Sequence, residues 1–440
     1  MDWFKFGLLL QDNIPLYTVI LTLSILIYVF LFRKIYLSIL DPLIFSLIFS
    51  VFGFSVVWFL YFTNSIELRY LLSYIFTQTA FWLGLFTFKA LNTKGIFAKD
   101  KTVILEKEEL FVLIFFWVTS GLYIFLQLLS YIVIGVPILL GTHVDIYSNS
   151  GGWGIIGKII DIDKPVSIFL LFYFLLKPAT SIYIYLYRYF FIFLLVVFFA
   201  LSDSKGDFMS VGLIFFCFLL LNASKYKTYF NNFRKTERVI ILSGIFFAYL
   251  TIFIQAVVSG GDTNYFYIFM FRLIASGDIY FFSYVNGLIE HVSGEKPFLA
   301  MFGEVFSTLR IVPRDQQPKV LGYQFYQMFF DSDTVAGPNS RHNVFGYVYF
   351  GFYGSIVFSY LIGLLLSVVR NKLFYVLKKN IVGQVVFLLL YLNLVSLETD
   401  PPMAFSAVES ILTIFPFILG ITFLIHMSMA GVTNRKAALS

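Results

Sequence analysis

Apolar segments of about 20 residues recur along this chain and are separated by short polar stretches. A helix needs about 20 mainly apolar residues to cross a membrane, so each segment predicts a transmembrane helix. The fifth segment is short and lies between Pro165 and Pro178, which predicts either a half-span or a continuation of the residues before it. The pattern predicts an all-α integral membrane protein with about 11 transmembrane helices, at residues 14–32, 43–62, 71–91, 110–134, 165–177, 181–201, 208–223, 239–258, 344–369, 383–397 and 403–427.

One long stretch, residues 259–343, interrupts this pattern and holds eight acidic and six basic residues. Its segments 265–275, 280–292 and 298–311 mix aromatic and aliphatic side chains with polar ones. That mixture is typical of amphipathic helices in the membrane interface. We therefore divide the chain into residues 1–258 with the first eight helices, a large loop at 259–343, and residues 344–440 with the last three helices.

The distribution of charge predicts the orientation of these helices. Most of the 31 Lys and Arg residues fall on one side of the predicted membrane, and most of the 25 Asp and Glu residues fall on the other. Cytoplasmic loops carry an excess of Lys and Arg. We therefore expect an outside N-terminus, a cytoplasmic C-terminus and an extracytoplasmic 259–343 loop. Nucleotide-dependent chemistry is not expected there, because nucleotides are cytoplasmic, so an activated substrate would arrive on a lipid.

Composition supports a membrane protein and excludes other classes. The chain is 59% hydrophobic and 13% charged, whereas soluble domains are about 25% charged. A net charge of +6 does not indicate a nucleic-acid partner here, because the placement of basic residues in a membrane protein matters more than their sum. Cys217 is the single cysteine, so no intrachain disulfide is expected. The first apolar segment has no cleavage signal after it and is expected to remain as a helix.

Two pairs of residues in the loop are candidates for phosphate chemistry. Arg310 and Arg314 predict a diphosphate clamp, because guanidinium groups bind phosphate oxygens bidentately; they could equally form salt bridges with nearby acids. Arg341 and His342 precede the ninth span and suit a phosphate contact and a general base. The alternative for this second pair is a basic anchor at a helix end.

Other polar residues are candidates with equally open alternatives. Lys205 lies in a polar turn that could hold a phosphate or be solvated. Glu409 lies inside the last apolar segment, where a carboxylate indicates either function or a structural hydrogen bond. Glu398 and Asp400 are interpreted as a solvated turn. No zinc motif or phosphate-loop motif is present in the sequence. Asp161-Ile162-Asp163 and Asp331-Ser332-Asp333 match a DxD metal pair, but such triplets are common by chance, so no metal or cofactor is expected.

The loop and the helix that follows it resemble one family of membrane enzymes. Pro313-Arg314 is similar to the Pro-Arg element of Wzy-type O-antigen polymerases, although this chain has Pro318-Lys319 where that family has Lys-Pro. His342-Asn343-Val344-Phe345 and Phe350-Gly351-Phe352-Tyr353-Gly354 are similar to the His-Asn-x-Phe and Phe-Gly-x-x-Gly elements of that family. The resemblance covers most of the chain as topology and about 50 residues as motif.

The resemblance implies a GT-C-like glycosyltransferase of the bacterial inner membrane. It would transfer a growing glycan from undecaprenyl diphosphate to an incoming undecaprenyl-diphosphate-linked repeat unit, with inversion, without a metal, and with a chain-length-regulating membrane protein as a further partner. Arg314 and Arg341 would stabilise the diphosphate, with Arg310, Arg272 and Lys205 as further cations. His342 is the first candidate base, followed by Glu304, Asp278 and Glu409. A lipid-linked oligosaccharide flippase and an O-antigen ligase are the alternatives.

Overall fold

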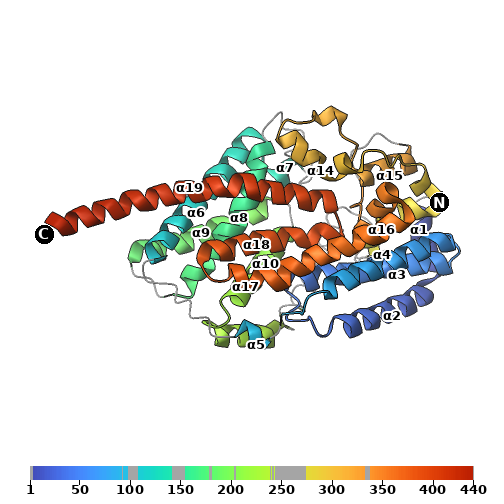
Figure 1. The fold of residues 1–440 in the computed structure, drawn as a ribbon, viewed down its shortest axis with the longest axis horizontal. Coiled ribbons are helices and arrows are strands. Elements are labelled where there is room, and N and C mark those ends of the chain that lie inside the picture. The colour runs from blue at the N-terminus through green and yellow to red at the C-terminus, as the bar shows by residue number, and fades with distance from the viewer. Residues whose placement is uncertain are drawn as a thin grey trace. The chain divides into compact units, whose positions relative to one another are not determined.

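The protein is helical throughout the part of the chain that the computed structural model describes (Figure 1). That part comprises residues 3–91, 93–97, 108–140, 154–177, 181–202, 205–237, 239, 242, 274–331 and 337–439. The elements are α1 (Trp3–Asp12), α2 (Ile14–Phe32), α3 (Pro42–Phe62), α4 (Leu68–Phe86), α5 (Thr93–Ile96), α6 (Glu108–Val133), α7 (Pro137–Leu140), α8 (Gly154–Leu175), α9 (Ile182–Leu201), α10 (Lys205–Leu221), η1 (Ala275–Gly277), α13 (Asp278–Tyr284), η2 (Val285–Glu290), α14 (Pro297–Thr308), η3 (Arg314–Gln316), α15 (Leu321–Phe330), α16 (His342–Val368), η4 (Val369–Leu373), α17 (Phe374–Leu377), α18 (Ile381–Leu394), η5 (Val395–Glu398) and α19 (Pro401–Leu439).

Seven helical segments among the described residues are long and apolar enough to cross a membrane. The multi-pass, all-α architecture predicted from the sequence is thereby confirmed, whereas the count of about 11 spans is not. The apolar part of α10 is shorter than a span, and α8 carries charged residues in its first half. The predicted segment at 239–258 lies almost entirely outside the described residues.

The chain forms two compact units that alternate along the sequence. The first unit comprises residues 1–93, 228–372 and 393–406, and the second comprises residues 94–227, 373–392 and 407–440. In the first unit, α2, α3, α4 and α16 pack side by side (Figure 1). Helices α4 and α16 approach closely because Gly84 and Gly363 have no side chains. An added Cβ on Gly84 would lie 2.3 Å from the Tyr360 carbonyl oxygen, and one on Gly363 would lie 2.1 Å from the Phe81 carbonyl oxygen. Small residues allow such backbone contact between membrane helices.

The apolar helical segment predicted at 344–369 is confirmed within His342–Leu377, but α16 is a helical hairpin rather than one straight helix. Its backbone is non-helical at Gly351, where φ is 68° and ψ is −176°. His342 Nδ1 lies 2.9 Å from Ser359 Oγ, although 17 residues of straight helix would separate them by about 25 Å. A side chain on Gly346 would also lie 3.0 Å from Ser355 Cβ. A nine-residue arm, 342–350, therefore folds back against the longer arm, 352–368.

The segment 280–292, predicted as an amphipathic helix of the membrane interface, is divided between α13 and η2. Its position relative to the membrane stays a prediction. Every residue from Ile279 to Val285 is buried. Helix α13 packs along α3, and a side chain on Gly277 would lie 2.9 Å from the Cα of Gly53, midway along α3. The chain therefore re-enters the helical bundle at 275–284. Helix α14, in contrast, confirms the helix predicted at 298–311 and exposes Phe298.

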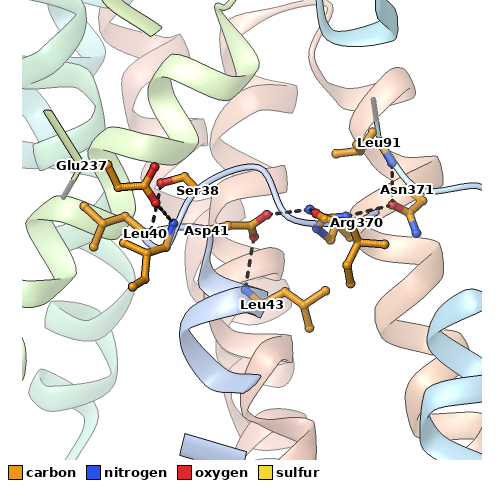
Figure 2. Close-up of polar contacts among 10 residues, drawn as sticks. Ser38, Leu40, Asp41, Leu43, Leu91, Glu237, Arg370 and Asn371 are labelled. Atoms are coloured by element: carbon orange, nitrogen blue, oxygen red, sulfur yellow. Dashed lines mark hydrogen bonds and ion pairs between the residues drawn. The ribbon is translucent and has the colours of Figure 1, made fainter. Parts of the chain in front are cut away.

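A buried ion pair holds one end of this unit together (Figure 2). Arg370 donates to Asp41 at 2.6 Å and to the Ile35 carbonyl at 2.9 Å. Asp41 also caps α3 by accepting from the Leu43 amide at 3.3 Å. Asn371 accepts from the Leu91 amide at 3.2 Å. Buried backbone groups need hydrogen-bond partners. Here the side chains of Arg370, Asp41 and Asn371 supply these partners in place of water.

The second unit packs α8 against α6 and α10. Three lysines of this unit are paired with acids: Lys158 with Glu409 at 3.2 Å, Lys164 with Asp207 at 2.6 Å, and Lys177 with Glu109 at 2.7 Å. Arg188 is buried and donates to the carbonyls of Phe174 and Lys177. Pairing of this kind is what allows charges within apolar helices to be retained.

Candidate active site

Three interruptions of helical structure meet in the first unit: η1 with the start of α13, the start of α16, and the end of η5. Arg341 joins them. Its amide donates to the Thr399 carbonyl at 2.7 Å. Its Nε and one terminal nitrogen donate to the Ser276 carbonyl at 3.0 and 2.8 Å. The side chain is only 3% exposed.

Gly53 makes room for this guanidinium within α3. A side chain on Gly53 would lie 3.2 Å from the central guanidinium carbon of Arg341. The cation also lies 5.9 Å from the ring centroid of Tyr280, on the adjacent α13. Arg341 itself has a φ of 41°, in the left-handed region that non-glycine residues rarely adopt. Such strain is retained where the surrounding contacts enforce it, and it clusters at functional sites.

Glu398 supplies the negative charge of this cluster. It is 1% exposed and accepts hydrogen bonds from Ser46, at 3.2 Å, and from Ser50, both on α3. Tyr28 of α2 donates to Ser50 at 3.4 Å. Burial acts to lower the pKa of Arg341, but Tyr280 and Glu398 outweigh it and raise that pKa above its usual value. The cation is therefore held permanently charged in the interior.

His342 lies in the wall of the cluster. It is fully buried, shares the hydrogen bond with Ser359, and stacks on Phe81 with ring centroids 4.8 Å apart. Its Nε2, like the buried Ser340 Oγ on the other side of Arg341, has no hydrogen-bond partner among the described residues.

Asn343 ties together the helices that surround the cluster. Its Oδ1 accepts from the Tyr280 hydroxyl at 2.7 Å. Its Nδ2 donates to Thr77 at 3.0 Å and to Gln78 at 3.3 Å, both on α4. One side chain therefore connects α16, α13 and α4, so the position of Arg341 is fixed by three helices at once.

Two carboxyl groups outside the candidate spans have raised pKa values: Asp278, which interacts with Arg341, and Asp400, which follows Thr399 in sequence. Asp278, the first residue of α13, is partly exposed, and its burial raises its pKa to about 7 against the opposing effects of the Ile279 amide and Arg341. Burial likewise raises the pKa of Asp400 to about 6, opposed by the Met403 amide. A carboxyl that titrates near neutrality can accept and return a proton during catalysis.

The structure brings together three of the residues predicted from the sequence: Arg341, His342 and Asp278. Glu304 and Arg310 are exposed, on α14 and just after it, and Glu409 is paired with Lys158 in the second unit. Arg314 begins η3 and Lys205 begins α10, but their side chains lie outside the described residues, as does all of Arg272.

Sequence reasoning missed Glu398, Gly53 and Tyr280. Glu398 was interpreted as part of a solvated turn, and its burial shows that interpretation to be wrong. The available signal was its position directly after the apolar residues of α18. Gly53 and Tyr280 carry no such signal, because a glycine or an aromatic residue in an apolar segment is ordinary. Comparison of the chain with family models, with curated proteins and with solved structures gives no match.

Proposed function

We propose that this protein is a membrane-embedded glycosyltransferase that polymerises lipid-linked oligosaccharide repeat units at the outer face of a bacterial inner membrane. The observation that carries the proposal is Arg341, a buried cation at the junction of three interrupted helices, compensated by Glu398. Ionisable residues inside the membrane mark substrate or ion sites by default. Irregular backbone at membrane depth is tolerated only where it is buried in protein or lines a cavity.

Arg341 suits the leaving diphosphate of such a reaction. The bond between the anomeric carbon and the diphosphate oxygen breaks, and the diphosphate leaves with the electron pair. Arg341 would exchange the Ser276 carbonyl for phosphate oxygens, a charge-assisted contact. The N-terminus of the 342–350 arm adds the positive end of a helix. Preorganised positive charge of this kind stabilises the transition state most in a low-dielectric site. Arg314, Arg310, Arg272 and Lys205 remain proposed further cations.

Asp278 is the better-placed proton acceptor in this scheme. The acceptor sugar hydroxyl forms the new bond to the anomeric carbon and loses its proton, and attack opposite the leaving group inverts that centre. Asp278 is partly exposed and has a pKa of about 7, whereas His342 is enclosed by Phe81 and Ser359. A base must reach the proton that it removes, which favours Asp278 and leaves His342 a positioning role.

An apolar groove in the same unit suits the lipid tail of the substrate. It lies between α2 and α3, has a volume of about 580 Å³, and is open along one side. Its wall includes Tyr28, whose hydroxyl joins the hydrogen bonds of Ser50 and Glu398. The groove therefore adjoins the polar cluster, as an isoprenoid chain attached to a diphosphate requires.

A reconstituted assay tests the proposal directly. Purified protein in liposomes is given the lipid-linked repeat unit, and products are resolved by length on a gel. Wild-type protein is expected to produce a ladder of polymers and release polyprenyl diphosphate. Arg341→Gln protein, folded to the same extent, is expected to produce none. A full ladder from the Arg341→Gln variant would overturn the assignment of the site.

A flippase is the second candidate, because transporters also place interrupted helices and charges at their substrate site. The same liposomes separate the two: a flippase moves the lipid-linked unit between leaflets without lengthening it. Deletion of the gene distinguishes an O-antigen ligase. Loss of a polymerase leaves one repeat unit attached to the lipopolysaccharide core, loss of a ligase leaves none, and loss of a flippase leaves the units inside the cell.

A further inference from the structure

A second, polar pocket opens at the end of the first unit where α3 and α4 meet. It has a volume of about 370 Å³ and is formed by the turn at 64–70 and by residues 284–291. Ligand pockets usually occupy about 300 to 1,000 Å³, so this one has room for one or two sugar rings. The turn joins the ends of two helices, which places the pocket at the boundary between membrane and water.

The pocket presents an ordered set of planar polar groups. Arg69 pairs with Glu67 at 3.0 Å and with Glu290 at 3.6 Å. Tyr347 donates to Glu290 at 2.8 Å. The three charged side chains are 51%, 67% and 41% exposed, respectively, so they remain accessible to a ligand. Two carboxylates and one guanidinium disfavour an anion and suit the adjacent hydroxyls of an uncharged sugar, which donate to carboxylates and accept from Arg.

Backbone strain shapes the wall of this pocket. Asn64, Asn286 and Gly287 all line it and have φ values of 54°, 60° and 68°. A side chain on Gly287 would lie 3.2 Å from the Tyr70 hydroxyl. Left-handed residues persist where the surroundings enforce them and concentrate at functional sites. Asn64 and Asn286 are the two strained positions of this wall, since glycine adopts a positive φ freely.

A column of tyrosine rings connects the pocket to the Arg341 cluster. Tyr70 stacks on Tyr284 with centroids 5.2 Å apart, and Tyr284 lies 5.6 Å from Tyr280, one turn earlier in α13. Tyr280 in turn contacts the Arg341 guanidinium at 5.9 Å. Tyr284 in the pocket and Tyr280 beside Arg341 are therefore about one helical turn apart, close to 6 Å along α13.

We infer that this pocket binds an uncharged sugar ring of the glycan carried by the lipid diphosphate and so holds that glycan in line with Arg341. The inference rests on the proposed function. Glu290 and Arg69 would bind adjacent hydroxyls, and Glu67 would hold Arg69 in place. The pocket would then contribute to sugar selectivity, separately from diphosphate binding at Arg341.

The test uses full-length protein in nanodiscs and two probes. The first probe is the repeat-unit oligosaccharide released by mild acid from the polysaccharide of the host, and the second is polyprenyl diphosphate without sugar. Glu290→Gln keeps an acceptor for Tyr347 and removes the charge. It is expected to weaken oligosaccharide binding about tenfold, or about 1.4 kcal/mol, and to leave polyprenyl diphosphate binding unchanged. Arg69→Lys is expected to act in the same direction.

Glu295→Gln is the matched control, because Glu295 is an exposed acid in the same segment that does not line the pocket. It should change neither Kd. Equal oligosaccharide binding by wild-type and Glu290→Gln proteins, or no oligosaccharide binding by wild-type protein, would overturn the assignment of this pocket as a sugar site. Arg341→Gln separates the two proposals. If that variant binds polyprenyl diphosphate as wild-type protein does, the diphosphate site at Arg341 is wrong. The oligosaccharide measurement still tests the sugar pocket independently.

Discussion

Two roles are proposed for Arg341, and a substitution must separate them: the cation compensates the buried Glu398, and it would bind the diphosphate. Arg341→Ala should reduce turnover by about 100-fold or more, the usual loss when a preorganised donor is removed from a transition state. It should also lower stability, since it leaves the buried Glu398 without its compensating charge. Turnover in liposomes and unfolding in denaturant measure the two effects.

The double variant Arg341→Ala with Glu398→Gln provides the control. It removes both charges, so stability should recover while turnover stays low. If restored stability also restored turnover, the role of Arg341 would be structural.

As the proposed base, Asp278 should make the rate of the reaction depend on pH. Its folded pKa of about 7 lies well above its ordinary value of 3.8. As a base it must be ionised, so kcat/KM should rise with pH and level off above about 7. Asp278→Asn should abolish this rise of kcat/KM with pH and reduce kcat by about 100-fold or more. A wild-type rate profile that is flat from pH 5 to 8 would contradict the assignment.

Stability provides a second readout of the same carboxyl group. Because the folded pKa is raised, the protonated form is favoured in the folded state. The stability that Asp278 contributes is full below the unfolded pKa and is lost as pH rises through about 7. Thermal unfolding at pH 5.5 and 8 should show this loss in wild-type protein and a smaller one in Asp278→Asn.

The residues of the site could be predicted from the sequence only in part. Arg341 and His342 were identifiable because a basic pair directly precedes an apolar segment. The enclosure of His342 was not, since Phe81 and Ser359 come from distant positions. Glu398 resembled a surface residue because polar residues follow it in sequence, and only its contacts with Ser46 and Ser50 reveal its burial.

At the scale of elements, the hairpin of α16 depends on Gly351. Its φ of 68° with a ψ of −176° is open essentially to glycine alone. Gly351→Ala should therefore destabilise the protein by about 1 to 3 kcal/mol, although no atom lies within 4 Å of the added carbon. It should also reduce turnover, because His342 and Arg341 begin the short arm.

Gly121 is the control for this substitution. It also has open space around it, but it lies within the regular helix α6. Gly121→Ala should be neutral or stabilise by up to about 1 kcal/mol. Similar unfolding free energies for the two alanine variants would show that the backbone of Gly351 is not strained.

Hydropathy predicted the helical segments but not the fold-back within α16. The arm 342–350 is apolar because it is buried in protein. The apolar pattern of a spanning helix and that of a buried short helix are the same over ten residues. The non-helical backbone at Gly351 separates the two arms of α16, and hydropathy alone does not reveal it.

At the scale of the whole molecule, Asp41 and Arg370 join segments more than 300 residues apart. Both side chains are almost completely buried. Asp41→Ala removes the carboxylate that faces the buried Arg370 guanidinium and should destabilise the protein by about 3 to 5 kcal/mol. Glu109→Ala, which removes the partly exposed pair with Lys177, should cost about 1 kcal/mol or less. Comparable losses in denaturant unfolding would indicate that the Asp41 pair is hydrated.

The orientation of the chain is the largest-scale prediction, and the single cysteine makes it testable. Cys217 is the single cysteine, so a Cys217→Ser background carries no thiol and should not react with maleimides. Glu67 lies in the α3–α4 turn, which charge places outside, and Lys379 lies before α18, which charge places in the cytoplasm. Both are exposed. A membrane-impermeant maleimide should label Glu67→Cys in intact spheroplasts and Lys379→Cys only after permeabilisation. The reverse pattern would put Arg341 and the polar pocket on the nucleotide-containing side, and a lipid-linked donor would no longer be required.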